Sequence, residues 1–266
     1  MQSLAELDAE LARALRGVVF DVDDTLTRGG RIEEPAYRAL WQLKEAGLVL
    51  LAVTGRPLGF AEILARTWPV DAAVGENGAG FIRVTDSQLQ RGFYAPERER
   101  MEHAQLLAAV TARVAREAPF AQLTDDSWAR RCDVAWDVGE RVQLPAAQVA
   151  ELRHIIEDAG ARCMVSSVHA HALAGTYDKS TGAQLAAREA LQLDIDRERE
   201  RWLFVGDSGN DAAAFAYFPV SAGVANVQRH LHALPKPPRF VSQEDHGRGF
   251  AEIAAHILAL RSQAST

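Results

Sequence analysis

A short apolar run that ends in two closely spaced aspartates constrains this chain more than any other feature. Val18, Val19 and Phe20 are followed by Asp21 and Asp23. Such a run is typical of a buried strand, and alternate residues of an extended chain project the same way, so both carboxylates can converge on one ion. Carboxylates at the carboxyl end of a strand predict a site for a hard cation and a phosphate.

Three later segments also place polar groups at the end of an apolar run or at the start of a helix. They are residues 49–56, 177–180 and 202–211. The first ends in a hydroxyl and in exposed amides that suit an anion, the second places a lysine at the head of a helix, and the third delivers two more carboxylates. A cation is disfavoured near a helix N-terminus, so the lysine predicts an anion nearby. The groups concerned are Thr54, Gly55, Arg56, Lys179, Asp207, Asn210 and Asp211.

The order of these segments resembles the haloacid dehalogenase superfamily, and within it the phosphatases that carry a large cap between the second and third motifs. The pattern Asp-x-Asp-x-Thr is met by Asp21, Asp23 and Thr25, the second-motif threonine by Thr54, the lysine by Lys179, and Gly-Asp-x-x-Asn-Asp by residues 206–211. One such motif is weak, but four in order are specific. Residues 76–79 and 246–250 also resemble the branch of sucrose-phosphate, mannosyl-phosphoglycerate and Cof-type phosphatases.

Strand and helix patterns alternate along the chain, which predicts a parallel sheet covered on both faces. The resemblance implies an α/β fold with a Rossmann-like, doubly wound core and an inserted α+β cap. We expect the core to comprise residues 1–83 and 174–266, and the cap to comprise residues 84–173.

Two segments of the expected cap carry polar faces. Alternation in residues 130–137 predicts a strand with one buried face, and residues 161–171 predict a second strand. Arg131, Asp133 and Asp137 share the polar face of the first strand, and Ser167, His169 and His171 share one face of the second. In the family the open face of the cap sheet closes over the site, so these polar residues, Arg131 and His169 among them, are candidate substrate contacts. The alternative is that such residues are solvated or satisfied by their neighbours.

The resemblance also implies a mechanism. The Asp21 carboxylate attacks phosphorus to give an aspartyl-phosphate, and Asp23 protonates the leaving oxygen and then activates water. Lys179 and Thr54 stabilise charge on the phosphoryl oxygens. The remaining assignments are Mg²⁺ ligands at Asp21, Asp23 (through its carbonyl), Asp207 and Asp211, and substrate contacts at Thr25, Gly55, Arg56 and Asn210.

One departure from the family pattern concerns the residue after the second aspartate, which is usually glycine and here is Asp24. Glycine tolerates backbone conformations that aspartate adopts less readily, and the extra carboxylate lies near a site for an anion. We expect the Asp24 side chain to turn away from the ion.

Composition excludes some classes of partner. Lysine and arginine total 29 against 36 acids, for a formal charge of −7, which argues against a general nucleic-acid binder. No apolar run has the length of a membrane span, and the first residues lack the pattern of a signal peptide, so we expect a cytoplasmic enzyme. The partner implied is a small-molecule phosphate ester, and a homo-oligomer stays possible.

Two other functions remain open. A phosphomutase of the phosphomannomutase type has a similar core and cap but must bind a bisphosphate, and no extra basic cluster in the cap clearly provides a second phosphate site. A non-catalytic sugar-phosphate-binding protein would be expected to lose Asp21, Asp23 or Asp207, and all three are present. The favoured prediction is a Mg²⁺-dependent phosphomonoester hydrolase acting on a sugar phosphate or a related small metabolite.

Overall fold

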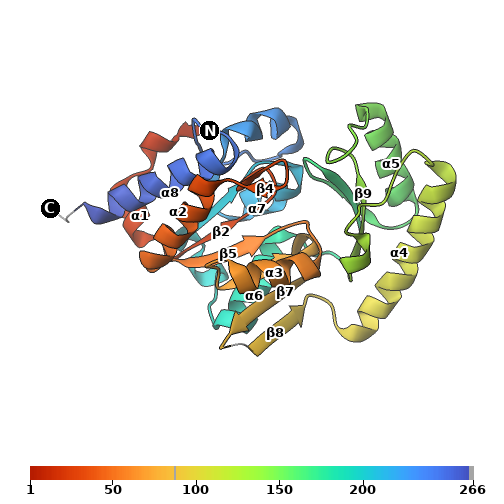
Figure 1. Ribbon diagram of the computed structural model, residues 1–266, viewed down its shortest axis with the longest axis horizontal. Coiled ribbons are helices and arrows are strands. Elements are labelled where there is room, and N and C mark those ends of the chain that lie inside the picture. The colour runs from red at the N-terminus through yellow and green to blue at the C-terminus, as the bar shows by residue number, and fades with distance from the viewer. Residues whose placement is uncertain (87, 264–266) are drawn as a thin grey trace.

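The computed structural model describes residues 1–86 and 88–263, apart from the side chain of residue 233. A nine-stranded sheet forms its larger part, in the order β1-β14-β13-β12-β2-β5-β6-β7-β8 (Figure 1). In this sheet order, all neighbouring strands between β1 at one edge and β6 are parallel. The β7–β8 hairpin then extends the sheet with antiparallel pairs. The strands are β1 (Gln2–Ser3), β2 (Gly17–Phe20), β5 (Val49–Val53), β6 (Ala72–Gly75), β7 (Gly80–Thr85), β8 (Gln88–Phe93), β12 (Trp202–Gly206), β13 (Val220–Gly223) and β14 (Phe240–Val241).

Helices cover both faces of this sheet because its central strands are apolar on both sides. In β2, Val18 and Phe20 belong to one core cluster and Val19 to the other. The first cluster includes residues of α1 (Ala9–Ala14), α2 (Glu34–Glu45), α3 (Leu58–Thr67) and α8 (His246–Ser262), and the second includes residues of α6 (Lys179–Leu191) and α7 (Ala212–Tyr217). The predicted α/β fold with a doubly wound core is confirmed.

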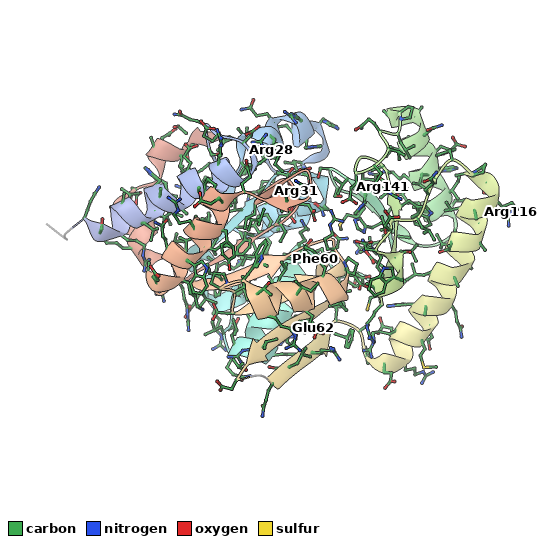
Figure 2. The ribbon with its side chains drawn as sticks, viewed as in Figure 1. Arg28, Arg31, Phe60, Glu62, Arg116 and Arg141 are labelled. Atoms are coloured by element: carbon green, nitrogen blue, oxygen red, sulfur yellow. The ribbon has the colours of Figure 1, made fainter. Side chains whose placement is uncertain are left out.

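A second, three-stranded sheet lies to one side, with the strand order β10-β11-β9 (Figure 1). Its strands are β9 (Asp133–Asp137), β10 (Arg162–Val165) and β11 (His169–Leu173), and its helices are α4 (Glu97–Glu117) and α5 (Ala146–Asp158). Trp136, Ala170 and Ala172 pack with both helices on one face. The polar residues of β9 and β11 therefore lie on the opposite face. Figure 2 shows Arg141 on the side of this unit that faces the large sheet and Arg116 on its outer side.

Short elements complete the chain. The antiparallel strands β3 (Thr27–Arg28) and β4 (Arg31–Ile32) form a small ribbon after β2. The 3₁₀ helices are η1 (Leu4–Glu6), η2 (Glu76–Gly78), η3 (Ser127–Ala129), η4 (Asp196–Arg201), η5 (Gly209–Asp211) and η6 (Ala225–Ala233). None of the helices in the described part of the chain combines the length and apolarity needed to span a membrane.

Two expectations about the cap need comment. The boundary placed at residue 84 falls within the β7–β8 hairpin, whose two strands both extend the large sheet, and the division of the chain at residues 84 and 173 stays a prediction. The prediction of one strand over residues 161–171 is wrong, because the chain reverses at residues 166–168 and β10 pairs antiparallel with β11. This turn contains Ser166, Ser167 and Val168, so it lacks the glycine, proline or asparagine that marks many turns.

Candidate active site

Lys179 occupies the centre of the candidate site. Strands β2 and β12 are neighbours in the sheet, so the residues that follow them meet at one edge. The Lys179 ammonium nitrogen lies 2.7 Å from Oδ1 of Asp21 and 2.7 Å from Oδ1 of Asp211. The lysine side chain is fully buried, and Asp178 caps its helix by accepting hydrogen bonds from the amides of Ser180 and Thr181. The lysine thus joins the first and last motifs.

Three buried carboxylates gather around this lysine. Asp21, Asp207 and Asp211 each offer an oxygen within 4.8 Å of the others. Burial, opposed by Lys179 and reinforced by the neighbouring aspartates, raises the pKa of Asp21 to about 7. Burial and the charge of Asp21 likewise raise the pKa of Asp207 well above its usual range. Three acids share one ammonium group here, so the set has an excess of negative charge that a divalent cation would neutralise.

Hydrogen bonds fix the orientation of these acids. Asp211 Oδ2 accepts from the amides of Asp207 and Ser208 at 2.8 and 3.0 Å. The hydroxyl of Thr25 lies 3.2 Å from Oδ1 of Asp207, and Asn226 donates to Oδ2 of Asp207 at 3.0 Å. Asn226 was not among the residues predicted from the sequence. It also bonds the carbonyl of Asp24 at 3.0 Å, so it joins the first and last motifs from a third segment.

Asp23 is held by the second motif. Arg56 donates to both carboxylate oxygens of Asp23, at distances between 2.8 and 3.1 Å, and the Thr54 hydroxyl lies 3.4 Å from Asp23 Oδ2. The same guanidinium also donates to Glu140 at 2.6 Å, and Glu140 follows β9. Arg56 therefore connects the loop after β2 to the three-stranded unit.

The Asp24 backbone adopts the left-handed conformation, with a φ of 55°. This is the conformation for which glycine is the common choice, and aspartate is among the residues that tolerate it best. Its amide lies 3.1 Å from the Thr27 hydroxyl, and its carboxylate lies 3.8 Å from His246 Nε2. Asp24 therefore fits the turn in place of the usual glycine.

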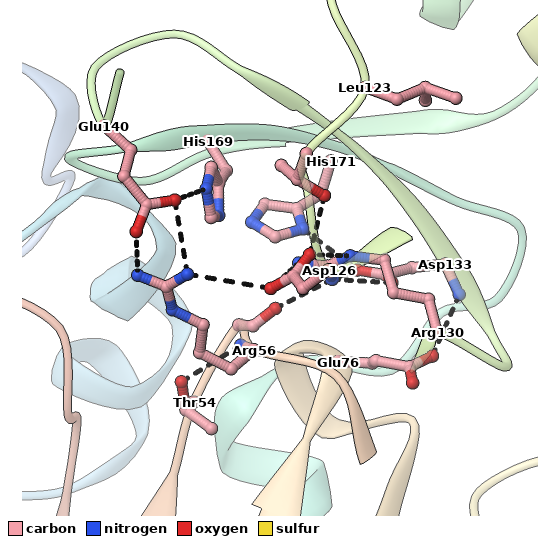
Figure 3. Close-up of polar contacts among 12 residues, drawn as sticks. Thr54, Arg56, Glu76, Leu123, Asp126, Arg130, Asp133, Glu140, His169 and His171 are labelled. Atoms are coloured by element: carbon pink, nitrogen blue, oxygen red, sulfur yellow. Dashed lines mark hydrogen bonds and ion pairs between the residues drawn. The ribbon is translucent and has the colours of Figure 1, made fainter. Parts of the chain in front are cut away.

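The polar face of the three-stranded sheet closes onto this site (Figure 3). His169 Nε2 lies 2.8 Å from Glu140 and His171 Nδ1 lies 2.9 Å from Asp133. Between this face and the loops that follow β2, β5 and β12 there is a cavity with about 10 Å³ of free volume, room for one water-sized group. The cavity is lined by Asp21, Asp23, Gly55, Ser166, Ser167, Val168, His169, His171, Ser208 and Asn210.

Glu76 links the two units by a contact that sequence reasoning missed. Its buried carboxylate accepts from the amide of Leu58 at 3.0 Å and from those of Arg131 and Asp133 at 3.0 and 3.1 Å. Burial, together with the charge of Asp133, raises the pKa of Glu76 to about 7. Both Glu76 and Asn77 have left-handed backbones, with φ values of 50° and 57°. The Glu-Asn-Gly sequence was the available signal, since a short segment with asparagine and glycine favours such a turn.

Of the remaining predicted residues, Asn210 and Gly55 lie at the cavity and Arg131 does not. Asn210 lines the cavity and donates to Asn77 at 3.0 Å, and a Cβ at Gly55 would lie only 3.2 Å from His171 Nε2. Arg131 is not brought to the cavity. Its side chain lines a separate volume of about 520 Å³ beside α3 and Trp128.

The conserved-sequence profile of haloacid dehalogenase-like hydrolases matches residues 18–128. This part of the chain is therefore similar to the haloacid dehalogenase-like hydrolases. We refer below to the three-stranded unit with α4 and α5 as the cap.

Two comparisons with individual proteins agree with this assignment. The chain is 26% identical, over 90% of its own length and 95% of the relative's, to a phosphoglycolate phosphatase from Haloarcula marismortui. A similar protein from Methanothermobacter thermautotrophicus, also named phosphoglycolate phosphatase, is 23% identical over 92% of this chain and 99% of its own.

Solved structures share the fold. A Thermoplasma acidophilum protein matches with a TM-score of 0.68 and 21% identity, over 92% of this chain and 99% of its own. The sucrose-phosphatase of Synechocystis, solved with sucrose and phosphate, matches with a TM-score of 0.65 and 16% identity, over 92% and 98% of the two chains.

Proposed function

We propose that the protein is a Mg²⁺-dependent phosphomonoester hydrolase that forms an aspartyl-phosphate and acts on a sugar phosphate or a related small metabolite. The contact of Lys179 with both Asp21 and Asp211, at 2.7 Å each, is the observation that carries this proposal. It places a fixed cation beside the acid proposed as nucleophile and beside a second acid of the last motif.

The chemistry at phosphorus is assigned to Asp21. Its carboxylate attacks and the ester oxygen leaves, which divides one difficult displacement into two easier ones. Lys179 then stabilises charge on the phosphoryl oxygens, together with the Thr54 hydroxyl and the amide of Gly55. Preorganised donors of this kind contribute roughly 3 kcal/mol each to the transition state.

The proton transfers are assigned to Asp23. It gives a proton to the leaving oxygen and later removes one from the water that hydrolyses the intermediate. The Arg56 guanidinium, which holds both oxygens of Asp23, fixes the carboxyl group while it changes between these roles. Because Arg56 also bonds Glu140 of the cap, cap closure and the orientation of the acid are coupled.

The residues present fit a magnesium ion. Three buried carboxylates face one lysine, and oxygen ligands with room for water are what Mg²⁺ prefers. Asp21, Asp207 and the Asp23 carbonyl would hold it, and Asp211, whose oxygens already bond Lys179 and two amides, would support the set. When bound, the ion neutralises the charge that otherwise opposes the approach of a phosphate to Asp21.

The free volume of the closed cavity, about 10 Å³, is too small for any phosphate ester. Substrate entry therefore requires the cap to move away from the catalytic loops, as lids do in many enzymes. Closure afterwards would exclude bulk water and bring the cap face onto the leaving group.

Three measurements separate the three candidate functions: phosphate release, phosphate exchange and ligand binding. With Mg²⁺ we expect steady phosphate release from para-nitrophenyl phosphate, and no release once EDTA removes the metal. Exchange of phosphate between hexose phosphates without net release would instead identify a mutase. Binding of a sugar phosphate without either reaction would identify a non-catalytic protein, and full activity in EDTA would refute the metal assignment.

A further inference from the structure

His171 stands at the cap side of the catalytic cavity without a role in the mechanism above. It comes from β11, its side chain is fully buried, and it lines the same cavity as Asp21 and Asp23. Its Nε2 atom has no hydrogen-bond partner within residues 1–86 and 88–263. A buried ring nitrogen without a partner costs free energy unless a ligand supplies one.

The other ring nitrogen shows which proton the imidazole carries. Nδ1 lies 2.9 Å from Oδ2 of Asp133, and Arg130 donates to Oδ1 of Asp133 at 2.9 Å. Although burial alone would raise it, Arg130 and His171 hold the pKa of Asp133 below its usual range. Asp133 is therefore an ionised acceptor, so the ring proton lies on Nδ1 and Nε2 presents a lone pair.

Burial also keeps this ring neutral. It lowers the pKa of His171 to about 4, against the opposing effect of Asp133. At neutral pH the ring thus points a hydrogen-bond acceptor into the cavity. The contact of Arg130 with the Gly55 carbonyl, at 2.9 Å, ties the Arg130–Asp133–His171 chain to the loop of the second motif.

A second unpaired group lies in the same cavity. Ser167 Oγ is buried, lines the cavity and likewise has no partner in the described part of the chain. A hydroxyl can donate and accept, so one ligand hydroxyl could donate to His171 Nε2 and accept from Ser167. A carboxylate or an ether oxygen could accept from Ser167 but has nothing to donate.

We propose that His171 is a specificity-determining residue that accepts a hydrogen bond from a hydroxyl of the leaving group. The preferred substrates are then phosphate esters of polyols or sugars. Esters whose leaving group carries an ether or a carboxylate in place of this hydroxyl are disfavoured. This inference rests on the proposed phosphatase function, since the leaving group must point from Asp21 toward the cap. Phosphoglycolate, the compound in the names of two relatives, belongs to the disfavoured class.

The first test compares esters that differ only in the donor. We would measure kcat/KM for 2-hydroxyethyl phosphate and glycerol phosphate against their methyl ethers and against phosphoglycolate, with para-nitrophenyl phosphate as reference. A site that bonds a hydroxyl rejects analogues without one, so we expect at least about a tenfold preference for a hydroxyl ester. Hydrolysis of the reference with no such preference would overturn the proposal while leaving the phosphatase function intact. No hydrolysis of any ester would instead count against both.

Variants locate the preference. His171→Phe keeps a ring but has no acceptor, so the ratio of kcat/KM between hydroxyl and ether esters should fall toward one. The control His154→Phe, at an exposed position of α5, should keep the ratio. In Asp133→Asn the amide oxygen would remain toward Arg130 and the NH₂ group would face Nδ1, which shifts the ring proton to Nε2. That variant should favour the ether and the carboxylate. An unchanged ratio in folded His171→Phe protein would refute the assignment.

A spectroscopic measurement on the wild-type protein does not depend on whether a variant folds. Long-range ¹H–¹⁵N spectra distinguish the two tautomers of a neutral imidazole from the charged ring. For His171 in the unliganded protein at neutral pH we expect the form with the proton on Nδ1. A proton on Nε2, or a doubly protonated ring, would contradict the proposal.

Discussion

The loops at the edge of the large sheet and the cap both bury carboxylates, but they balance the charge differently. In the core, Asp21, Asp207 and Asp211 share Lys179. In the cap, Asp133 has both Arg130 and His171. Burial and repulsion raise the pKa of Asp21 to about 7, whereas partners hold the pKa of Asp133 down. The core cluster thus carries an excess of negative charge, while the charges of the cap cluster are paired within it.

This difference separates two tasks. A cluster with excess negative charge can accept a cation and so suits the reaction proposed for all substrates, whereas a cluster whose charges are already paired suits recognition of one leaving group. Arg56 joins them, because its guanidinium bonds Asp23 on one side and Glu140 on the other. Hydrogen bonds from His169 and Arg56 hold the pKa of Glu140 at about 2, so this connection is ionised at neutral pH.

The largest effect should come from the core. Asp21→Asn removes the proposed nucleophile, and we expect kcat to fall by at least about 10⁴-fold on every ester. Rapid acid quenching with labelled substrate should trap phosphate on the wild-type protein and none on the variant. Asp24→Asn is the matched control, since asparagine also tolerates the left-handed backbone at this position. A trapped phosphate on any residue other than Asp21 would contradict the mechanism.

The core side of this comparison was accessible from sequence because its acids come after strands and its lysine begins a helix. The strand is visible as an apolar run, and parallel strands deliver their ends to one edge. The cap contacts join residues with no local signal: His171 and Asp133 are 38 positions apart, and Arg56 and Glu140 are 84 apart. The partners of Glu76 could not be predicted from sequence for a further reason. They are backbone amides, which every residue except proline carries.

A second test removes the shared cation. Lys179→Met should reduce kcat by about 10²- to 10³-fold, because every phosphoryl group meets the same donor. The reduction should be equal for para-nitrophenyl phosphate and for a sugar phosphate. Since Asp21 and Asp211 lose their ammonium partner, circular dichroism should first establish that the variant is folded. A loss confined to one of the two esters would break the division between core and cap.

A smaller effect is expected where the two regions meet. Glu140→Gln weakens the contact of the cap with Arg56 and His169, and because Glu140 is partly exposed we expect roughly a 3- to 10-fold loss in kcat/KM for a sugar phosphate. His169→Ala should behave similarly, and less change is expected with para-nitrophenyl phosphate, which reaches few cap residues. Glu151→Gln, on the exposed side of α5, is the matched control. Equal losses on both esters would show that the cap supplies catalytic groups.

The smallest effect concerns stability, and its sign distinguishes the two regions. The pKa of His171 is lowered from 6.5 to about 4, so between these pH values the unfolded chain binds more protons than the folded protein. The contribution of His171 to stability is therefore fully present above pH 6.5 and is lost as the pH falls through 4. The pKa of Asp21 is raised from 3.8 to about 7, so its contribution is present below pH 3.8 and is lost as the pH rises through 7.

Urea unfolding of metal-free protein between pH 4.5 and 6 would resolve these opposed contributions. One proton changes the slope of unfolding free energy by at most about 1.4 kcal/mol per pH unit. His171→Phe should therefore lower the slope relative to the wild type, and Asp21→Asn should raise it. Mg²⁺ should abolish the second difference, because the ion keeps Asp21 ionised, and should leave the first unchanged, because His171 lies in the cap. A slope that Mg²⁺ alters equally in both variants would mean that the two clusters titrate as one, and that the separation drawn between them is wrong.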